Sequence, residues 1–369
     1  YGFERIKAAD MIDSYNFEDR KLVEIVKATY FNPKIVVIDE TTTALSQEGR
    51  EELYKHMERI RKSGNTVIFI SHDLPEIIEK SDTITILRDG VYIDTVKSKD
   101  VNENDLKKLM VGREVTGDYY RSDYGEKISD EVVLSAKHVT VPGLIEDVSF
   151  DLHKGEILGF GGLSESGMHE IGKAIFGASY DREGTVELAD GTQINDIPTA
   201  IKHSIAYTSK DRDNESVVLN QSIGDNICLP SLDELSGPAH LISDKKKKDL
   251  ANKFAKQMSV KMVDVNQFVS NLSGGNKQKV VLARWIGKDS DIVVLDSPTR
   301  GIDIKVKQDI YQLMNQMRKN GKSIIMISEE LMELIGMCDR IMIMKDGKIS
   351  GELERDQNLD ENGLITMMV

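Results

Sequence analysis

The feature that most constrains the fold of this sequence is a repeat with a fixed spacing of 257 residues. Three segments of the first part match three segments of the second part at that spacing. The matched pairs are residues 35–45 with 292–302, 68–73 with 325–330, and 89–90 with 346–347. Self-similarity at a fixed offset indicates a duplicated structural unit. The sequence therefore predicts two copies of one fold, with no insertion between the matched points.

The first copy enters the chain midway. The second copy has a glycine-rich turn near Gly162, whose counterpart at this spacing falls before Tyr1, and the chain begins with tyrosine. We therefore expect residues 1–112 to be the C-terminal part of a first copy, and the chain to be the C-terminal part of a longer polypeptide or a gene fragment. Residues 113–131 are polar without apolar periodicity and are predicted to be a linker. Residues 132–369 are predicted to be a complete second copy.

The pattern of apolar residues predicts an α/β fold. The runs 35–38, 67–70 and 292–295 are apolar without alternation, which is typical of strands covered on both faces. An amphipathic helix is expected at residues 47–61, and a hairpin over Asp89-Gly90. The second copy should open with antiparallel strands, followed by a strand at 156–160, the turn, a helix from about Met168, and a mostly helical insert at 222–268.

Composition narrows the class of protein. The chain has 369 residues, which is enough for more than one domain, and its formal net charge is −14. An acidic surface argues against a nucleic-acid partner held through phosphate contacts. Two cysteines make a disulfide framework improbable and fit a reducing compartment. No apolar run approaches the length of a membrane span, so the described sequence is not expected to cross a bilayer.

The turn at residues 162–169 has the form of a phosphate-binding loop. Gly-x-x-x-x-Gly-Lys-[Ser/Thr] binds phosphates through backbone N–H groups and lysine, and places a hydroxyl on Mg²⁺. Here the lysine position is Met168 and the hydroxyl position is His169. A thioether cannot offset phosphate charge, and imidazole is a poor ligand for a hard cation. We expect nucleotide contacts without turnover from the residues of this loop: Gly162, Ser164, Glu165, Ser166, Gly167, Met168 and His169.

A second glycine-rich stretch, Leu-Ser-Gly-Gly-Asn-Lys-Gln-Lys at 272–279, runs into a helix. Ser273 is a good N-cap residue, and glycines at a helix start let a phosphate approach the main chain. We expect an anion site at Ser273, Gly274, Gly275 and Asn276, although a plain serine-capped helix fits the stretch alone. The next strand ends in Asp296, at the strand end where parallel sheets bind ligands.

This order of glycine-rich helix entrance, buried strand and aspartate resembles the signature and Walker B motifs of the ABC ATPases. The resemblance implies a P-loop NTPase cassette with a three-layer parallel sheet core, an antiparallel β subdomain and a helical subdomain, here duplicated. It implies ATP and Mg²⁺ as cofactors, with Asp39 and Asp296 on the metal side.

The two copies differ in the residues that this family uses for hydrolysis. The first copy has Asp39, Glu40 and His72, which the resemblance assigns to the metal, the base for water and the γ-phosphate sensor. The plain alternative is that Glu40 caps a helix and His72 lies in a surface loop. In the second copy the last two positions are Ser297 and Glu329, and Lys210 stands near the usual Gln or Glu of the Q-loop.

The signature motif shows the opposite pattern. Its counterpart in the first copy, residues 15–19, has no Ser-Gly-Gly, and we expect Glu18 and Asp19 to repel a phosphate. Cassettes of the family pair head to tail, with ATP between the Walker motifs of one and the signature of the other. We therefore expect one competent site, with Glu40 and His72 facing the signature of the second copy, and one degenerate site.

Further motifs resemble the ATP-binding subunits of bacterial monosaccharide importers of the ribose, galactose or xylose type. They are Gly-Glu-Ile-Leu-Gly-Phe-Gly-Gly-Leu at 155–163, Asp211-Arg212, Ser-Pro-Thr-Arg-Gly-Ile-Asp at 297–303, and Met110-Val111-Gly112-Arg113. The chain departs from that pattern at Met168 and Ser297, which weakens any claim for the second site.

The resemblance implies a peripheral protein on the cytoplasmic face of the membrane, bound to permease subunits and served indirectly by an external sugar-binding protein. Cassettes would pair within the full-length chain or with a second copy, and no nucleic acid is involved. Three alternatives remain open at this point. They are a nucleoside importer of the same family, a soluble twin-cassette factor acting on ribosomes or DNA, and a non-hydrolysing nucleotide-binding fragment.

Overall fold

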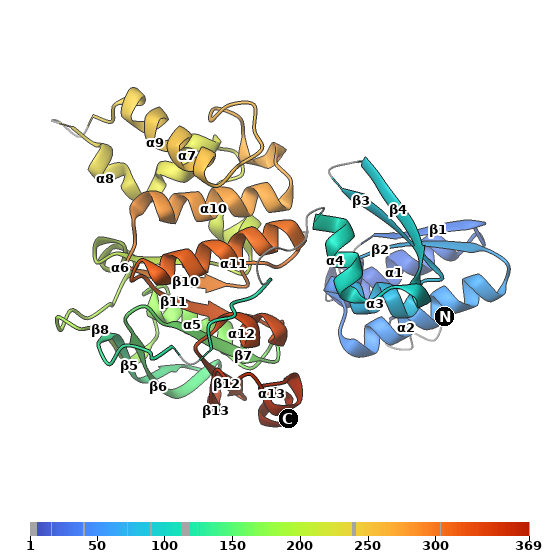
Figure 1. The fold of residues 1–369 in the computed structure, drawn as a ribbon, viewed down its shortest axis with the longest axis horizontal. Coiled ribbons are helices and arrows are strands. Elements are labelled where there is room, and N and C mark those ends of the chain that lie inside the picture. Colours follow the sequence, from blue (N-terminus) through green and yellow to red (C-terminus); the bar gives the residue numbers. More distant parts are fainter. Residues whose placement is uncertain are drawn as a thin grey trace. The chain divides into compact units, whose positions relative to one another are not determined.

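The computed structural model describes residues 6–15, 17–39, 41–71, 73–88, 91–111, 119–124, 126–237, 241–302 and 304–368. The chain falls into two units (Figure 1). Unit 1 is Tyr1–Thr116 with Asp303–Lys305, and unit 2 consists of Gly117–Ile302 together with Val306–Val369.

Unit 2 is built on a six-stranded sheet. Its order is β13 (Lys348–Glu354), β12 (Arg340–Lys345), β7 (Ile157–Gly162), β11 (Ser323–Ile327), β10 (Ile292–Asp296) and β9 (Ile205–Thr208). All neighbouring strands are parallel except β13, which runs antiparallel to β12. Every residue of β7, β10 and β11 is buried, as their non-alternating apolar runs predict. Parallel strands end at one edge, so the turn after β7 lies near the carboxylate that ends β10.

Helices cover both faces of this sheet. Helix α5 (Met168–Ile175) packs on β7, β10 and β11. On the opposite face α12 (Leu331–Met337) approaches β7 so closely that a Cβ at Gly161 would lie 2.7 Å from Leu334 Cδ1. The remaining helices of the core are α11 (Ile304–Lys319) and α13 (Glu361–Met368). The arrangement is the predicted three-layer core.

Two further groups of elements flank the core of unit 2, at opposite ends in Figure 1. The antiparallel sheet has the order β6 (Ile145–His153), β5 (Val132–Val141) and β8 (Glu183–Leu188). The helical group contains α7 (Ile223–Cys228), α8 (Leu232–Leu235) and α9 (Asp244–Gln257), and α7 and α9 pack against α10 (Gly274–Lys288). Shorter helical elements are α6 (Ile197–Lys202), Arg212–Ser216, Leu229–Ser231 and Val269–Asn271. Both subdomains lie where the sequence predicted them.

Unit 1 has two small sheets and four α-helices among its described residues. Strand β1 (Ile35–Asp39) pairs in parallel with β2 (Thr66–Ile70), and β3 (Thr83–Arg88) pairs antiparallel with β4 (Val91–Lys97). The helices are α1 (Phe17–Thr29), α2 (Gln47–Lys62), α3 (Leu74–Lys80) and α4 (Glu103–Val111). Short 3₁₀ turns lie at Ile12–Ser14, Thr41–Ala44 and Ser98–Asp100.

Six consecutive strands and α-helices of unit 1, from β1 to β4, have the bounds of β10 to β13 shifted by 257 residues. Their internal contacts also correspond. Glu76 accepts hydrogen bonds from three hydroxyl groups, and Glu333 accepts from the three hydroxyls at matching positions. These donors are Thr42, Tyr54 and Ser71 in unit 1, and Thr299, Tyr311 and Ser328 in unit 2.

The prediction that β1 and β2 are covered on both faces is wrong. Val36 and Ile38 are buried, whereas Val37 is 58% exposed and Ile70 is 45% exposed. Ile35 and Ile68 are exposed on the same strands. The residue pattern is that of a doubly covered strand, but no described part of the chain covers the second face in unit 1.

Part of the segment expected to be a linker is packed into unit 2. The rings of Tyr119 and Tyr120 lie 5.4 and 5.3 Å from the ring of Tyr311, measured between centroids. The Arg121 guanidinium is buried and forms ion pairs with Asp339 at 2.7 Å and with Asp123 at 3.0 Å. Residues 112–118 and 125 lie outside the described part of the chain.

Both cysteines, Cys228 and Cys338, are buried and free, in agreement with the prediction that no disulfide forms. Within the residues that the structure describes, no helix has both the length and the apolar character needed to cross a membrane.

Candidate nucleotide site

The glycine-rich turn after β7 has a geometry that two of its glycines make possible. A Cβ at Gly162 would lie 2.3 Å from Ser166 Oγ, and a Cβ at Gly167 would lie 2.6 Å from the Leu144 carbonyl oxygen. Gly167 also has φ +90°, a conformation that L-residues rarely adopt. The Ser166 N–H donates to the Leu163 carbonyl at 2.9 Å, which closes the turn. Helix α5 begins directly afterwards, so its positive end faces the turn.

The Met168 side chain belongs to the hydrophobic core and not to the surface of this turn. It is 0% exposed and lies in the main apolar cluster of unit 2. The lysine position of the motif therefore supplies no charge to a phosphate. The sequence predicted this loss of charge, but it did not predict that the residue fills the core.

His169 occupies the hydroxyl position and is hydrogen-bonded to Asp296, with His169 Nδ1 2.7 Å from Asp296 Oδ1. Both are buried, and the Asp296 carboxylate also accepts from the Tyr207 hydroxyl at 3.4 Å and the Ser297 hydroxyl at 3.3 Å. Burial lowers the pKa of His169, but the hydrogen bonds to Asp296 and Glu329 outweigh it and raise the pKa above its usual value. Burial, together with the Asp296 charge, raises the pKa of Tyr207.

Glu329 joins this group through one oxygen. Its Oε1 accepts from the Ser164 hydroxyl at 2.7 Å and from Lys210 Nζ at 2.6 Å, and His169 Nε2 lies 3.4 Å away. Lys210 Nζ also lies 3.0 Å from His169 Nε2. Hydrogen bonding from His169, and then from Lys210 and Ser164, holds the pKa of the Glu329 carboxyl far below its usual range. The structure thus brings together residues that follow β7, β9, β10 and β11. Glu165 lies exposed on the same turn.

The residues of this cluster do not fit Mg²⁺. The ion prefers oxygen ligands in octahedral geometry. Here an imidazole stands in place of the hydroxyl, and Asp296 already accepts hydrogen bonds from His169, Tyr207 and Ser297. Across the described ranges, no group of three or more His, Cys, Asp or Glu side chains is arranged to hold a metal ion. The expectation that Asp296 contributes to a magnesium site therefore has no support from this geometry.

The structure describes only some of the residues of unit 1 that were predicted to act in catalysis. Asp39 ends β1 and is exposed. Glu40 and His72 lie outside the described residues, as does the Glu18 side chain. Asp19 is buried at 7% exposure, so the prediction that its charge faces a phosphate is not supported.

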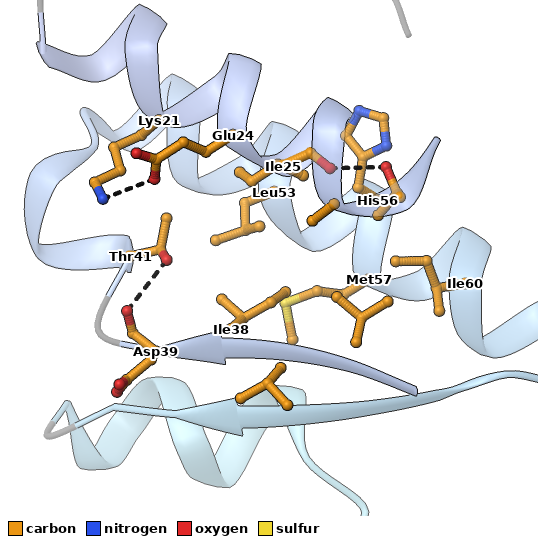
Figure 2. A pocket seen from close by; sticks show the side chains of 14 residues that line it. Lys21, Glu24, Ile25, Ile38, Asp39, Thr41, Leu53, His56, Met57 and Ile60 are labelled. Carbon is orange, nitrogen blue, oxygen red and sulfur yellow. Dashed lines mark hydrogen bonds and ion pairs between the residues drawn. The ribbon is translucent and has the colours of Figure 1, made fainter. Parts of the chain in front are cut away.

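A pocket of about 250 Å³ lies beside Asp39 in unit 1, between α1, β1 and α2 (Figure 2). Aliphatic side chains form most of its wall, and Lys21 and Glu24 pair with each other at 2.8 Å at its side. Among the described residues β1 pairs only with β2, whereas its counterpart β10 also pairs with β9 on the other edge. The composition of the wall does not suit a phosphate, so we assign it no nucleotide contact.

The stretch 272–279 forms the start of α10, as predicted, but its serine does not cap the helix through its side chain. Ser273 is the N-cap residue and its hydroxyl accepts from Asn276 Nδ2 at 2.9 Å. The Asn276 side-chain oxygen in turn accepts from the Lys261 N–H at 2.7 Å. The Arg212 guanidinium lies close to Gly274, since a Cβ there would be 3.2 Å from Arg212 Nη2. Gly275 follows as the next residue of the helix. No hydrogen bond among the described residues joins this stretch to the turn 162–169.

Comparison with known proteins identifies the family. The model of the family described as ABC transporter matches residues 145–300. The ribose import ATP-binding protein RbsA of Clostridium perfringens is 37% identical over 353 residues, which cover 95% of this chain and 70% of that protein. The xylose import ATP-binding protein XylG of Thermoanaerobacter pseudethanolicus is 42% identical over 350 residues, covering 92% and 68%. The chain belongs to the ATP-binding proteins of ABC transporters. Members of this ATPase family bind ATP with Mg²⁺ and couple its hydrolysis to transport.

Solved structures of ABC cassettes share the fold of this ABC ATPase. A dimeric ATP-binding cassette in a post-hydrolysis state bound to ADP and phosphate has a TM-score of 0.53 at 21% identity, covering 60% of this chain and 99% of that one. A nucleotide-free cassette from an ABC transporter has a TM-score of 0.55 at 17% identity, covering 64% and 99%. The predicted P-loop NTPase cassette with its β and helical subdomains is confirmed.

Two features of the site in this ABC ATPase were not predicted from its sequence. Lys210 and Glu329 were each recognised as departures from the family pattern, but not as a pair. The sequence did hold a signal for this ion pair, because residues of opposite charge stand at two motif positions that both approach a nucleotide phosphate. The contact of the Tyr207 hydroxyl with Asp296 had no signal, because it depends on the alignment of β9 beside β10.

Proposed function

We propose that this chain is the ATP-binding subunit of an ABC importer for a monosaccharide. The observation that carries the proposal is 37 to 42% identity, over more than 90% of the chain, to ribose and xylose import ATP-binding proteins. In this function the chain is peripheral on the cytoplasmic face of the membrane and binds permease subunits. An external binding protein delivers the sugar to those subunits.

The chain contains a duplicated cassette in this proposal, with residues 1–112 from the first and 132–369 from the second. The shared bounds of six consecutive elements at one offset support it. So does the correspondence between the hydroxyl groups around Glu76 and those around Glu333, because such a buried network is not required by the strand and helix order alone.

The two cassettes form one competent and one degenerate nucleotide site. Asp39 serves the metal, Glu40 takes the proton from the attacking water and His72 senses the γ-phosphate. The contacts of the second cassette support its assignment as degenerate. Met168 is in the core, His169 is bonded to Asp296, and Ser297 stands where the base would be.

ATP turnover and sugar uptake by the transporter, assembled from the full-length protein and its permease, test this assignment. Glu40→Gln should reduce kcat by about 100-fold or more, which is the usual contribution of a general base. Glu51→Gln, an exposed acid on α2, is the matched control and should retain turnover. Unchanged turnover in Glu40→Gln would remove the competent site from unit 1. ATP turnover that is lost in Glu40→Gln but does not respond to ribose or xylose in the wild type would keep the ATPase assignment and exclude those sugars as cargo.

A further inference from the structure

The carboxylate of Glu329 is surrounded by donors as a phosphate oxygen would be. A hydroxyl and an ammonium group donate to Oε1, from Ser164 and Lys210, and His169 Nε2 lies 3.4 Å from Oε1 and 3.0 Å from Lys210 Nζ. These groups come from the glycine-rich turn, the start of α5 and the segment after β9. Hydrogen bonds from charged donors to a carboxylate are among the stronger ones in proteins.

Glu329 also stands at the position of the terminal phosphate sensor. Its counterpart at the offset of 257 is His72, which the family uses to contact the γ-phosphate. A γ-phosphate bound at the turn 162–169 would therefore approach the Glu329 carboxylate and compete with it for Lys210. Two anions at short distance in a partly buried site repel each other strongly.

The inner phosphates of a nucleotide meet a different environment. The backbone N–H groups of the turn and the start of α5 remain as donors, as in any loop of this type. The Ser166 hydroxyl is buried inside the turn at 4% residue exposure and has no hydrogen-bond partner in the described part of the chain. A phosphate oxygen would satisfy that group, whose burial is otherwise costly. His169 stands at the position where the motif has the hydroxyl that binds Mg²⁺.

We propose that the glycine-rich turn of unit 2 binds a nucleoside diphosphate without a divalent cation, with Glu329 in the place of the terminal phosphate and Lys210 as the phosphate-binding cation. The proposal rests on the proposed function, because it defines the ligand of the degenerate site. In this proposal ADP stays bound at the unit 2 site, and ATP is neither needed there nor hydrolysed.

The only tryptophan of the chain gives a readout confined to unit 2. The ring of Trp285 contacts that of Phe176, with centroids 5.9 Å apart, and Phe176 lies 5.4 Å from the ring of Tyr207. Tyr207 in turn donates to Asp296. Nucleotide binding at the turn should therefore change the fluorescence of Trp285.

The experiment titrates the full chain with ADP and with ATP, each in Mg²⁺ and in EDTA. Tryptophan fluorescence gives the affinity, and equilibrium dialysis with labelled nucleotide counts binding even if the fluorescence does not respond. We expect ADP to bind about tenfold or more tightly than ATP, a difference of about 1.4 kcal/mol. Exchange of Mg²⁺ for EDTA should change the ADP affinity less than about twofold, since no metal contact is lost.

Three variants separate the roles of the charges. Glu329→Ala should bring the ATP affinity to within about twofold of the ADP affinity, because the like charge is removed. Lys210→Ala should weaken both nucleotides about tenfold, since a charge-assisted contact is lost. Lys322→Ala is the matched control. Lys322 has a similar side-chain exposure, pairs with Asp291 at the opposite edge of the sheet, and should leave binding unchanged. Glu329→Gln replaces Glu329→Ala if circular dichroism shows that the latter is unfolded.

Tighter binding of ATP than of ADP, a tenfold loss of ADP affinity in EDTA, or no bound nucleotide would each overturn the inference. None of these binding results depends on the turnover assay of the Glu40→Gln transporter, which tests the proposed function. Failure of the ADP site and failure of the proposed function are therefore distinguishable.

Discussion

Strands β1 and β10 have almost the same sequence and the same bounds at an offset of 257 residues, but their surroundings differ. Val37 is 58% exposed, and its counterpart Val294 is 0% exposed. Ile70 and Ile327 differ in the same way, at 45% and 0%. In unit 2 this face is covered by α5, where a Cβ on Gly172 would be 3.0 Å from Ile327. The residue pattern therefore specifies the strand, whereas burial of its side chains depends on what packs against it.

The same contrast separates the two aspartates that end these strands. Asp39 is exposed, whereas Asp296 is 1% exposed and accepts hydrogen bonds from His169, Tyr207 and Ser297. The backbone of unit 2 retains the turn and helix of a nucleotide site. In the proposed function, the loss of catalytic groups from this site is therefore a matter of side chains and leaves the fold intact.

The largest change in the free energy of unfolding should come from a charge on the sheet face that is buried in unit 2 and exposed in unit 1. Val294→Asp buries an unpaired carboxylate and should lower the free energy of unfolding by roughly 3 to 5 kcal/mol. Val37→Asp should change it by less than about 1 kcal/mol, because the side chain remains in water. Urea denaturation of both variants measures the difference. An equally large loss in Val37→Asp would mean that the face of β1 is covered in solution.

A smaller difference is expected at the two matching tyrosines. Tyr311 is 2% exposed and donates to the buried Glu333. Tyr311→Phe removes this hydrogen bond from a buried carboxylate and should lower the free energy of unfolding by about 2 kcal/mol. Tyr54 donates to Glu76 but is only partly buried, and Tyr54→Phe should cost under about 1 kcal/mol. Thermal unfolding tests the ranking, and a reversed order would show that burial does not control this network.

A glycine-to-alanine change should lower the free energy of unfolding equally in the two copies where the cost depends only on backbone conformation. Gly64 and Gly321 end their helices with φ of +82° and +84°, and an added Cβ meets nothing within 4 Å in either place. Alanine at each position should therefore cost about 1 kcal/mol, through the left-handed conformation alone. Unfolding free energies that differ by more than about 0.5 kcal/mol would contradict this equivalence.

The smallest effect concerns pH. The depressed pKa of Glu329 means that its ionised form stabilises the fold above its unfolded pKa of about 4.3, and that this contribution is lost as pH falls through the lower folded value. Wild type should therefore lose more stability than Glu329→Gln as the pH is lowered from about 5. The difference should stay under about 1 kcal/mol, because the Glu329 side chain is 38% exposed. Parallel pH profiles would show that the cluster adds no stability.

Much of this molecule could be predicted from local sequence. The repeat predicted the matching elements, the non-alternating run 292–295 predicted a buried strand, and the glycines at 162–169 predicted the turn. Patterns of this kind can be recognised from residue types at short spacings along the chain. Ser273 is the N-cap residue of α10, as predicted, but its hydroxyl accepts from the Asn276 side chain and not from a backbone N–H. The packing of Tyr119 and Tyr120 on Tyr311 was missed because those residues are almost 200 positions apart.

The sequence alone determined the family, the order of elements and the positions that depart from the motifs of the family, because these are properties of residue types at fixed spacings. Only the tertiary structure decided that Met168 turns into the core, that His169 bonds Asp296, and that Glu329 meets Lys210. These outcomes depend on side chains from separate strands meeting at one sheet edge. Their distances are set by the packing of the whole unit and not by the chain near each residue.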